Sequence, residues 1–248
     1  MTKQSGMGGG IYVGGYELSG DVGSLQSVHG GPNLGEVTAI DKSAIERIGL
    51  LFSGGIQYSS WFNPTDVTGS HDVLKALPYT DSQVTYRVDG TLGGPAATCL
   101  AKQVNYDGTR GADASFSFSV DAQSNGYSLL WGEALTAGTR TDTAATNGTA
   151  IDFGAVSTLF GAFTALHVIG VTGTSVTVTI EDSADNVSFT PITGLAFTAV
   201  AGAAVSQQFL ATSATATIRR YVRAATTGTF SNAQFHVNFV RNLTLTAL

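Results

Sequence analysis

The chain has 248 residues, of which 43% are hydrophobic and 12% are charged, and its formal net charge is −6. This hydrophobic content is enough for packed cores and excludes a largely disordered chain. The charged fraction is about half that of ordinary soluble domains, which indicates a protein that hides much of its surface in an assembly. No stretch approaches the ~18 apolar residues of a membrane span, so we expect no membrane partner.

In the first half, the opening residues predict a short strand at 11–13. Asp41 could cap a short helical turn that runs through Arg47 and is closed by Gly49. Residues 50–62 read as a long strand, broken or bulged at Gly54-Gly55. Ser70 then caps the best helix, at 71–77, which Pro78 ends.

Strands follow at 83–90, 96–108, 114–122 and 127–138, with turn signals at Asp89-Gly90 and Asp107-Gly108. The small, polar and aperiodic residues 139–149 read as a linker. The second half predicts seven short strands, at 163–171, 175–182, 188–192, 195–200, 205–211, 216–225 and 234–242. Seven strands joined by turns are typical of a β-sandwich.

The charge is divided unevenly along the chain. Residues 1–150 contain 8 Lys and Arg against 14 Asp and Glu, whereas residues 151–248 contain 4 of each. All the net acidity therefore lies in the first half, which argues against tight nucleic-acid binding because such binding needs a basic face. An acidic surface that lets nucleic acid slide past stays open.

Residues able to carry catalysis or bind a metal are few and scattered. The single cysteine, Cys99, lies in an apolar run and is expected to be buried and inert. The four histidines are His29, His71, His167 and His236, and no two of them form a pair at metal-ligand spacing. His167 and His236 lie within strand patterns, where a structural role is expected. Asp182 and Asp185 lack the ordered ligands of a calcium loop and read as a turn.

Two further clusters invite a binding role, and neither is specific. Tyr58, Trp61 and Phe62 could form a sugar-stacking platform, although aromatic residues in a strand more often pack in a core or between subunits. The only basic cluster is the run from Arg219 through Arg220 to Arg223, which we expect on a solvated face. We therefore expect no enzyme, and no catalytic, cofactor-binding or metal-binding residue; any ligand-binding residue stays unknown.

Several segments, in their order and residue pattern, resemble segments of the major tail tube proteins of long-tailed bacteriophages. The resemblance covers most of residues 11–140 and includes "LSGDVGSL", "VTAIDKSAIERIGLLFSGGIQYSSWFN" and "KQVNYDGTRGADASFSFSVDAQSNGYSLLWGEALTAG". The second half, from "HVIGVTGTSVTVTIEDSADN" to "IRRYVR", resembles the added β domain of some of these proteins, and also jelly-roll domains of the discoidin type.

The resemblance implies a mainly-β protein in two domains. Residues 1–140 would form a tail-tube-type β-sandwich or barrel with one short flanking helix, residues 141–150 a linker, and residues 151–248 a C-terminal β-sandwich of jelly-roll or Ig-like form. This second domain would decorate the outside of the tube.

In function, the resemblance implies a structural virion protein that forms stacked, hexameric rings, the tail tube, through which DNA passes without specific binding. Its partners would be copies of itself and other tail proteins, namely the tape measure, terminator and distal tail proteins. The N-terminus has no apolar signal-peptide core, so we expect synthesis in the host cytoplasm and a final location in the virion. The alternatives are another virion β protein, such as a head decoration or baseplate component, and a carbohydrate-binding lectin-like module.

Overall fold

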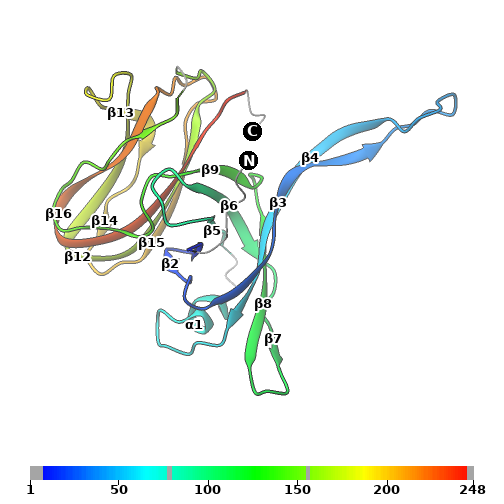
Figure 1. Cartoon of the computed structure of the whole chain (residues 1–248), viewed down its shortest axis with the longest axis horizontal. Coiled ribbons are helices and arrows are strands. Elements are labelled where there is room, and N and C mark those ends of the chain that lie inside the picture. The colour runs from blue at the N-terminus through cyan, green and yellow to red at the C-terminus, as the bar shows by residue number, and fades with distance from the viewer. Residues whose placement is uncertain (1–7, 77–79, 155–156, 245–248) are drawn as a thin grey trace.

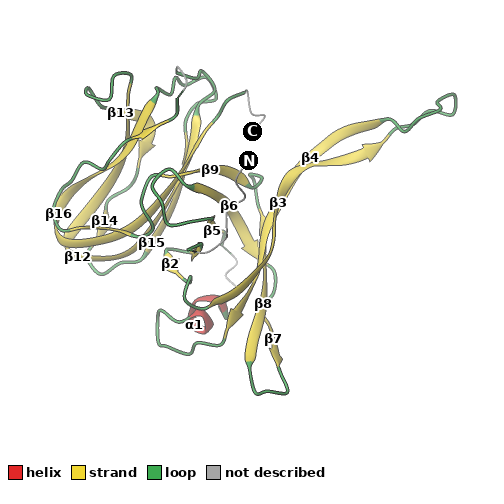
Figure 2. Cartoon of the chain, in the orientation of Figure 1, coloured by secondary structure: helices red, strands yellow, loops and turns green. Residues whose placement is uncertain are grey.

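The computed structural model describes residues 8–76, 80–154 and 157–244. They are almost entirely β-structure with one short helix, so the prediction of a mainly-β fold is confirmed (Figure 2). The elements are β1 (Gly10–Val13), β2 (Tyr16–Glu17), β3 (Val22–Glu36), β4 (Arg47–Trp61), α1 (Ser70–Leu74), β5 (Ser82–Arg87), β6 (Pro95–Gln103), β7 (Asp107–Arg110), β8 (Phe116–Ser124), β9 (Leu130–Ala134), β10 (Arg140–Asp142), β11 (Ile151–Asp152), β12 (Ala162–Ser183), β13 (Thr190–Ala196), β14 (Val200–Ala201), β15 (Ser206–Ala211) and β16 (Tyr221–Arg241).

Two apolar clusters divide the molecule, and we call their parts of the chain the N-terminal half (residues 8–134) and the C-terminal half (residues 135–244). The first cluster is built from residues between 11 and 129, and the second from Leu135 and residues between 162 and 239. One continuous antiparallel path joins them, in the order β13-β12-β16-β9-β6-β5-β1-β2. The domain boundaries at residues 140 and 150 stay a prediction.

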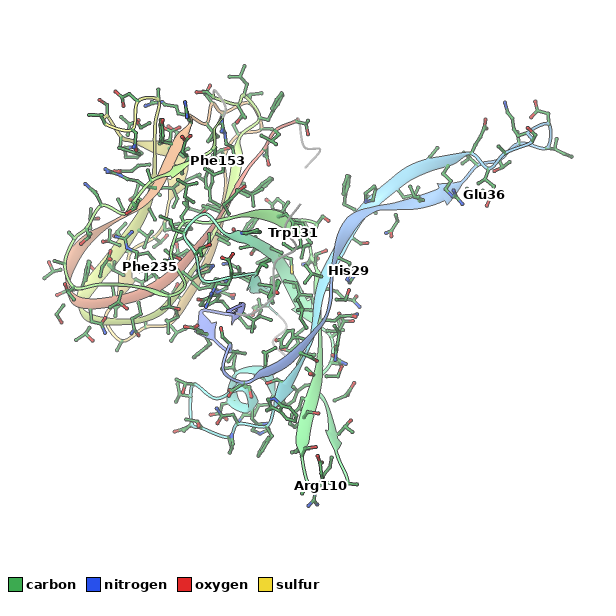
Figure 3. All side chains as sticks on the ribbon, viewed as in Figure 1. His29, Glu36, Arg110, Trp131, Phe153 and Phe235 are labelled. Carbon is green, nitrogen blue, oxygen red and sulfur yellow. The ribbon has the colours of Figure 1, made fainter. Side chains whose placement is uncertain are left out.

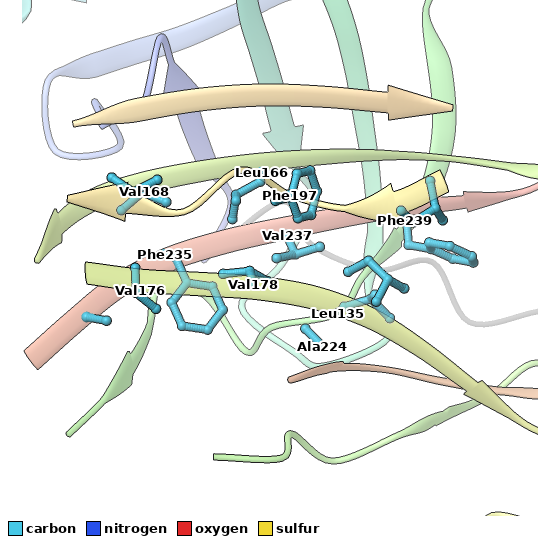
Figure 4. Close-up of a cluster of buried hydrophobic side chains, with 14 of the residues drawn as sticks. Leu135, Leu166, Val168, Val176, Val178, Phe197, Ala224, Phe235, Val237 and Phe239 are labelled. Atoms are coloured by element: carbon cyan, nitrogen blue, oxygen red, sulfur yellow. The ribbon is translucent and has the colours of Figure 1, made fainter. Parts of the chain in front are cut away.

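The C-terminal half is organised by the long hairpin-like pairing of β12 with β16 (Figure 1). The first part of β12 also pairs with β15, and its last part with β13 and β14. Leu166 and Val168 of the first part share one core with Val176 and Val178 of the last part (Figure 4). The strand pair therefore bends back on itself, and the apolar side chains fill the space between its two layers.

Two predicted strand breaks in this half are wrong. Residues 163–171 and 175–182 belong to the single strand β12, and 216–225 and 234–242 largely to the single strand β16. Register shifts on β12 lie beside Gly170 and Gly173, and Gly173 has a φ of +138°. The glycine and threonine residues that suggested turns instead mark β-bulges, which bend a strand without ending it.

The helix prediction is correct in place but not in its cap. α1 begins at Ser70, Gly69 is the N-cap, and there is no side-chain cap hydrogen bond. The Ser70 amide instead donates to Asp21 Oδ2 at 3.0 Å. Residues 77–79, including the proposed stop at Pro78, lie outside the described residues. No helical turn forms at 41–47, because these residues make the tip of the β3–β4 hairpin.

One predicted turn and one predicted strand break or bulge are also wrong. Asp107-Gly108 lies inside β7, and the hairpin turn comes later, where the Asp113 carboxylate accepts hydrogen bonds from the Ser115 amide and hydroxyl. Gly54-Gly55 is not a bulge either, since both residues pair in register with Gly30 and His29. Gly54 and Gly55 instead lie close to other backbone atoms, since added Cβ atoms would be 2.6 Å from the Leu129 nitrogen and 2.8 Å from the Ala122 oxygen.

The expected linker at 141–150 does not run free of the body. β10 pairs with β16 over three residues, and Thr146 and Thr226 exchange backbone hydrogen bonds at 3.2 and 3.0 Å. Asp142 is buried, and its carboxylate forms an ion pair with Arg140 at 2.7 Å. This segment is therefore an edge of the C-terminal half, because its polar groups find partners along β16.

The chain crosses the β3–β4 hairpin closely at Leu129. A Cβ atom added at Gly54 would lie 2.6 Å from the Leu129 nitrogen and 2.9 Å from the His29 oxygen, and one at Gly30 would lie 2.8 Å from the Leu129 Cβ. The Ser128 hydroxyl secures the crossing by donating to the Ser53 oxygen at 2.9 Å. Only glycine fits at these two strand positions.

We predict that Gly54→Ala destabilises the protein by about 1–3 kcal/mol, the usual cost of overpacking a site that cannot relax. Gly49→Ala is the matched control, because the nearest atom to its added methyl group would be Pro32 Cβ at 4.0 Å. We expect that control to change the free energy of unfolding by less than about 0.5 kcal/mol. Denaturant unfolding of both variants measures the difference, and equal stabilities would contradict the close crossing.

Candidate assembly surface

The most prominent feature of the surface is the outer part of the β3–β4 hairpin, residues 30–53, which we call the arm. β4 pairs with β8 only from Gly55 to Trp61, and beyond that point its one partner among the described strands is β3. The arm leaves the body and extends well away from both halves (Figure 1). Among the residues that the structure describes, no second layer covers the outer part of its two strands.

Burial changes abruptly where the arm begins. Residues 54–60 of β4 are buried or half-buried, whereas every residue from Arg47 to Ser53 is exposed. Large apolar side chains remain exposed along the whole arm, and Ile40 and Leu51 are the most accessible, at 107% and 85%. The apolar residues of the arm are Leu34, Val37, Ile40, Ile45, Ile48, Leu50, Leu51 and Phe52. So many exposed apolar side chains on one projection mark a contact surface.

An apolar hollow lies at the root of the arm. It has a volume of about 710 Å³ and lies between Leu50, Leu51 and Phe52 of the arm and the opposing residues Tyr127 and Phe163. The rings of Tyr127 and Phe163 are 5.7 Å apart, so the hollow adjoins the place where the two halves meet. The apolar surface of the arm therefore continues onto the body.

The inner end of the hairpin is anchored by one carboxylate. Asp21 accepts two hydrogen bonds from Asn63 Nδ2, at 2.9 and 3.0 Å, and a third from the Ser70 amide. The Ser70 hydroxyl donates to the Trp61 oxygen at 2.7 Å. These contacts tie the start of β3, the end of β4 and the start of α1 together, so the arm extends from a fixed base.

A second hairpin, β7–β8, projects from another side of the body, with Arg110 at its far end (Figure 3). All four residues of β7 are exposed, and β8 is its only partner among the described strands. β3 likewise pairs with β4 alone. Both strands present unpaired backbone groups to solvent, and such edges add strands from other chains readily.

Most basic residues among residues 1–150, the acidic part of the sequence, form ion pairs within the chain. Lys42 pairs with Glu46 at 3.6 Å, Arg87 with Glu17 at 3.9 Å, and the other pairs are Lys75–Asp72, Lys102–Asp81 and Arg140–Asp142. Within the described residues, no ion pair forms at Arg47, on the arm, or at Arg110. Most of the positive charge is thus already neutralised by neighbouring carboxylates.

The residues that the sequence offered as a sugar platform do not form one. Tyr58 is buried in the core of the N-terminal half, and burial raises the pKa of its phenol far above its ordinary value. Trp61 is half exposed, whereas Phe62 packs in a ring cluster with His71, at 4.9 Å, and Phe116, at 5.3 Å. Adjacent strand residues point to opposite faces, so these aromatic residues cannot stack on one sugar.

The other candidate residues have structural partners. Cys99 is fully buried, and burial raises the pKa of its thiol to about 12, so it is inert as a nucleophile. Asp185 accepts hydrogen bonds from the Val187 and Ser188 amides, as a turn residue does. The arginines of the basic cluster each have an acidic partner: Arg219 pairs with Asp182, Arg220 with Asp152, and Arg223 with Glu181.

His167 and His236 are both fully buried and lie opposite each other on β12 and β16. They face the N-terminal half, where the Tyr12 ring stacks on His236 with ring centres 4.3 Å apart.

Within the described residues, no group of three or more histidine, cysteine and acidic side chains is placed to hold a metal ion. The described helix is too short to cross a membrane. The arm was not predicted from the sequence, because residues 41–49 read as a helical turn and Leu50, Leu51 and Phe52 as part of a strand at 50–62.

No protein-family model matches the chain, and no curated protein matches it significantly. Several solved structures align with nearly all of it, among them two from phages. The Dit protein of phage SPP1, described as a paradigm of the hub adsorption apparatus in phages that infect Gram-positive bacteria, is 13% identical over 95% of this chain and 99% of its own, with a TM-score of 0.33. The phage P2 baseplate in its activated conformation with Ca contains a chain that is 8% identical, with the same coverages and a TM-score of 0.34. TM-scores in this range assign neither a fold family nor a function to this chain.

Proposed function

We propose that this chain is a structural subunit of a bacteriophage tail, and that its copies form rings which stack into a tube that conducts DNA. The observation that carries the proposal is the exposed apolar arm. A lone projecting hairpin with eight uncovered large apolar side chains is poorly suited to an isolated monomer. The kind of particle comes from the sequence resemblance to tail tube proteins.

The arm offers enough apolar surface to drive assembly. Burying one fully exposed Leu, Ile, Val or Phe side chain is worth about 1.5–3 kcal/mol. Six of the eight are already about half covered, so burying all eight is worth about 8–15 kcal/mol. Association costs an estimated 4–15 kcal/mol or more in lost translational and rotational freedom. Contact of the arm with a neighbouring copy therefore more than offsets the lower estimates of that cost.

Rings are the form of assembly that the arm favours. We propose that the arm of one copy docks on the body of the next in a head-to-tail contact, and not in the reciprocal exchange of arms that would close a two-fold dimer. Contacts of this kind close into rings when the rotation between copies allows it, and otherwise they extend as filaments. The open edges of β3 and β7 supply further sites where neighbouring copies can pair.

The charge distribution supports passage of DNA rather than binding. Five of the basic residues in the first half are paired with carboxylates of the chain, and few remain to contact phosphates. Each phosphate contact would release counterions and add affinity at every ring. We propose that the channel wall is acidic and polar for this reason, and that other tail proteins bind the ends of the tube.

We predict that Ile40→Glu combined with Leu51→Glu abolishes self-association. Both side chains are highly exposed, so the fold should be kept while each interface loses two apolar contacts and gains buried charge. The lost burial alone corresponds to an association constant at least about 100-fold weaker. Analytical ultracentrifugation over a range of concentrations measures this change.

Val187→Glu combined with Leu159→Glu is the control, because these residues are exposed apolar side chains outside the arm, at 80% and 62%. We expect this control to assemble as the unchanged chain does. Thermal unfolding of the monomeric arm variant should match that of the dissociated wild-type chain. Equal assembly by the two double variants would refute the role of the arm.

Electron microscopy of the assembled protein distinguishes the forms of the proposal. We expect rings stacked into tubes of uniform width. Single rings that never stack would instead indicate a baseplate hub, and isolated monomers on a capsid surface a head decoration protein. Specific signals on a glycan array from a chain that forms neither rings nor tubes would replace the structural role with a lectin-like one.

A further inference from the structure

The contact between the two halves is largely polar, in contrast to the two apolar cores on either side of it. Beside it the Tyr127 ring of the N-terminal half packs on Phe163 and Phe209 of the C-terminal half, with ring centres 5.7 and 5.0 Å apart. We call the polar contact the junction. Its residues in the N-terminal half are Tyr12, Gly15, Gln83, Thr85 and Arg87, and those in the C-terminal half are His167, Gln207 and His236. Gln83 and Gln207 join β5 to β15, since the backbone N–H of Gln83 donates to the side-chain Oε1 of Gln207 at 2.5 Å. Both histidines are 0% exposed, so their protonation states affect the stability of the junction.

The hydrogen bonds of His167 specify one neutral tautomer. The Gly15 amide donates to His167 Nδ1 at 3.3 Å, so this nitrogen carries no proton. His167 Nε2 therefore carries the proton and donates it to Thr85 Oγ1 at 2.8 Å. A second proton on the ring would place an N–H group at Nδ1 against the N–H group of Gly15, and the hydrogen bond between the halves would be lost.

His236 is neutral for a different reason. Its Nδ1 lies 3.1 Å from the Gly138 carbonyl oxygen and 2.9 Å from Thr136 Oγ1, and a carbonyl only accepts, so Nδ1 carries the proton. Its Nε2 is buried and has no hydrogen-bond partner among the described residues. A proton added at Nε2 would bring a buried positive charge with no acceptor.

The charged groups around the two rings do not favour a second proton. Arg87 donates to the Tyr12 hydroxyl at 3.2 Å, and the Tyr12 ring contacts both imidazoles, at 4.3 and 5.6 Å between centres. The acidic group of the junction region, Glu17, is held by Arg87 at 3.9 Å and accepts a hydrogen bond from Thr139 Oγ1 at 2.5 Å. Within the described residues, no carboxylate forms a hydrogen bond with either histidine.

We propose that the junction is an acid-sensitive hinge, in which proton uptake by His167 and His236 separates the two halves. The pairing of β10 with β16 lies within the C-terminal half and keeps that half intact. β9 pairs with β16 through two residue pairs beside the point where the chain passes from one half to the other, and it holds the halves together there. The opening turns about that connection and exposes both imidazoles to water.

The direction of the pH effect follows from the buried neutral rings. Burial, with the nearby Arg87 as a smaller cause, lowers the pKa of His236 to about 4, and burial together with His236 lowers the pKa of His167 well below its ordinary value. In the open state both return to about 6.5. Above that pH neither state takes up protons, and the junction keeps its full stability. Below it the open state binds more protons, so the junction weakens steadily as the pH falls toward about 4.

Energy transfer between two dyes on the full-length chain tests the hinge. Cysteines introduced at Thr109 and Val187, both exposed and one in each half, carry the dyes, while Cys99 is buried. An excess of unlabelled chain removes transfer between copies. We expect constant transfer above about pH 6.5 and a fall between about pH 6 and 4.5, with the open-to-closed ratio rising up to about 100-fold per pH unit while both histidines take up protons. Constant transfer down to about pH 4.5, with the β-sheet circular dichroism signal intact, would overturn the proposal.

The variant His167→Asn with His236→Asn removes both titrating groups. An asparagine oxygen can accept from Gly15 as His167 Nδ1 does, and an asparagine amide can donate toward Gly138 as His236 Nδ1 does. We expect transfer in this variant to be independent of pH over the same range. His29→Asn, which changes an exposed histidine of the arm root, is the control and should open as the wild type does. Opening of the double variant with the wild-type pH dependence would also overturn the proposal.

If the double variant does not fold, proton NMR titration of the wild-type histidines decides the question. The hinge requires two imidazoles that stay neutral in the closed state down to about pH 5. Titration of both near pH 6.5, with no change in the separation of the halves, would exclude it.

Discussion

The shape of the molecule depends on one close contact, the crossing of the chain at Leu129 over the β3–β4 hairpin. The two strands beneath it carry Gly30 and Gly54, where an added Cβ would lie 2.6–2.8 Å from the atoms of Leu129. Leu129 also belongs to the core of the N-terminal half. The crossing therefore fixes the point where the hairpin stops contributing to the core and becomes the arm.

The two halves are held by different kinds of interaction. Each half is stabilised by burial of apolar side chains, which is strong and largely independent of direction. The junction is held mainly by hydrogen bonds and stacked rings, which depend on geometry and whose loss leaves buried groups unsatisfied. Such a contact selects one orientation of the halves without the strength of a third core.

Much of the fold was readable from the sequence. The alternation of Val176, Val178 and Ile180 placed their side chains correctly in a core, and all three are buried there. Strand number was less accurate, because a glycine at a bulge and a glycine at a turn look alike without knowledge of the partner strand. Gly173 bends β12 and does not end it.

The site was the least predictable part. Leu50, Leu51 and Phe52 have the composition of a buried strand, and nothing local to them reveals that no layer covers them. The absence of cover is set by residues far away in sequence, namely Gln123, where β8 stops pairing with β4, and Leu129, which crosses the hairpin. The burial of Cys99 could be predicted, since it depends on the local apolar pattern.

The construction of the arm also gives it a mechanical direction. Hydrogen bonds in an antiparallel pair lie perpendicular to the strands. A pull on one strand along the length of the arm therefore loads in shear, and all together, the hydrogen bonds that join residues 30–36 of β3 to their β4 partners. A force across the arm meets only a single layer of sheet, which bends. A protein held to its neighbours by such arms would resist stretching between copies while allowing the line of copies to curve.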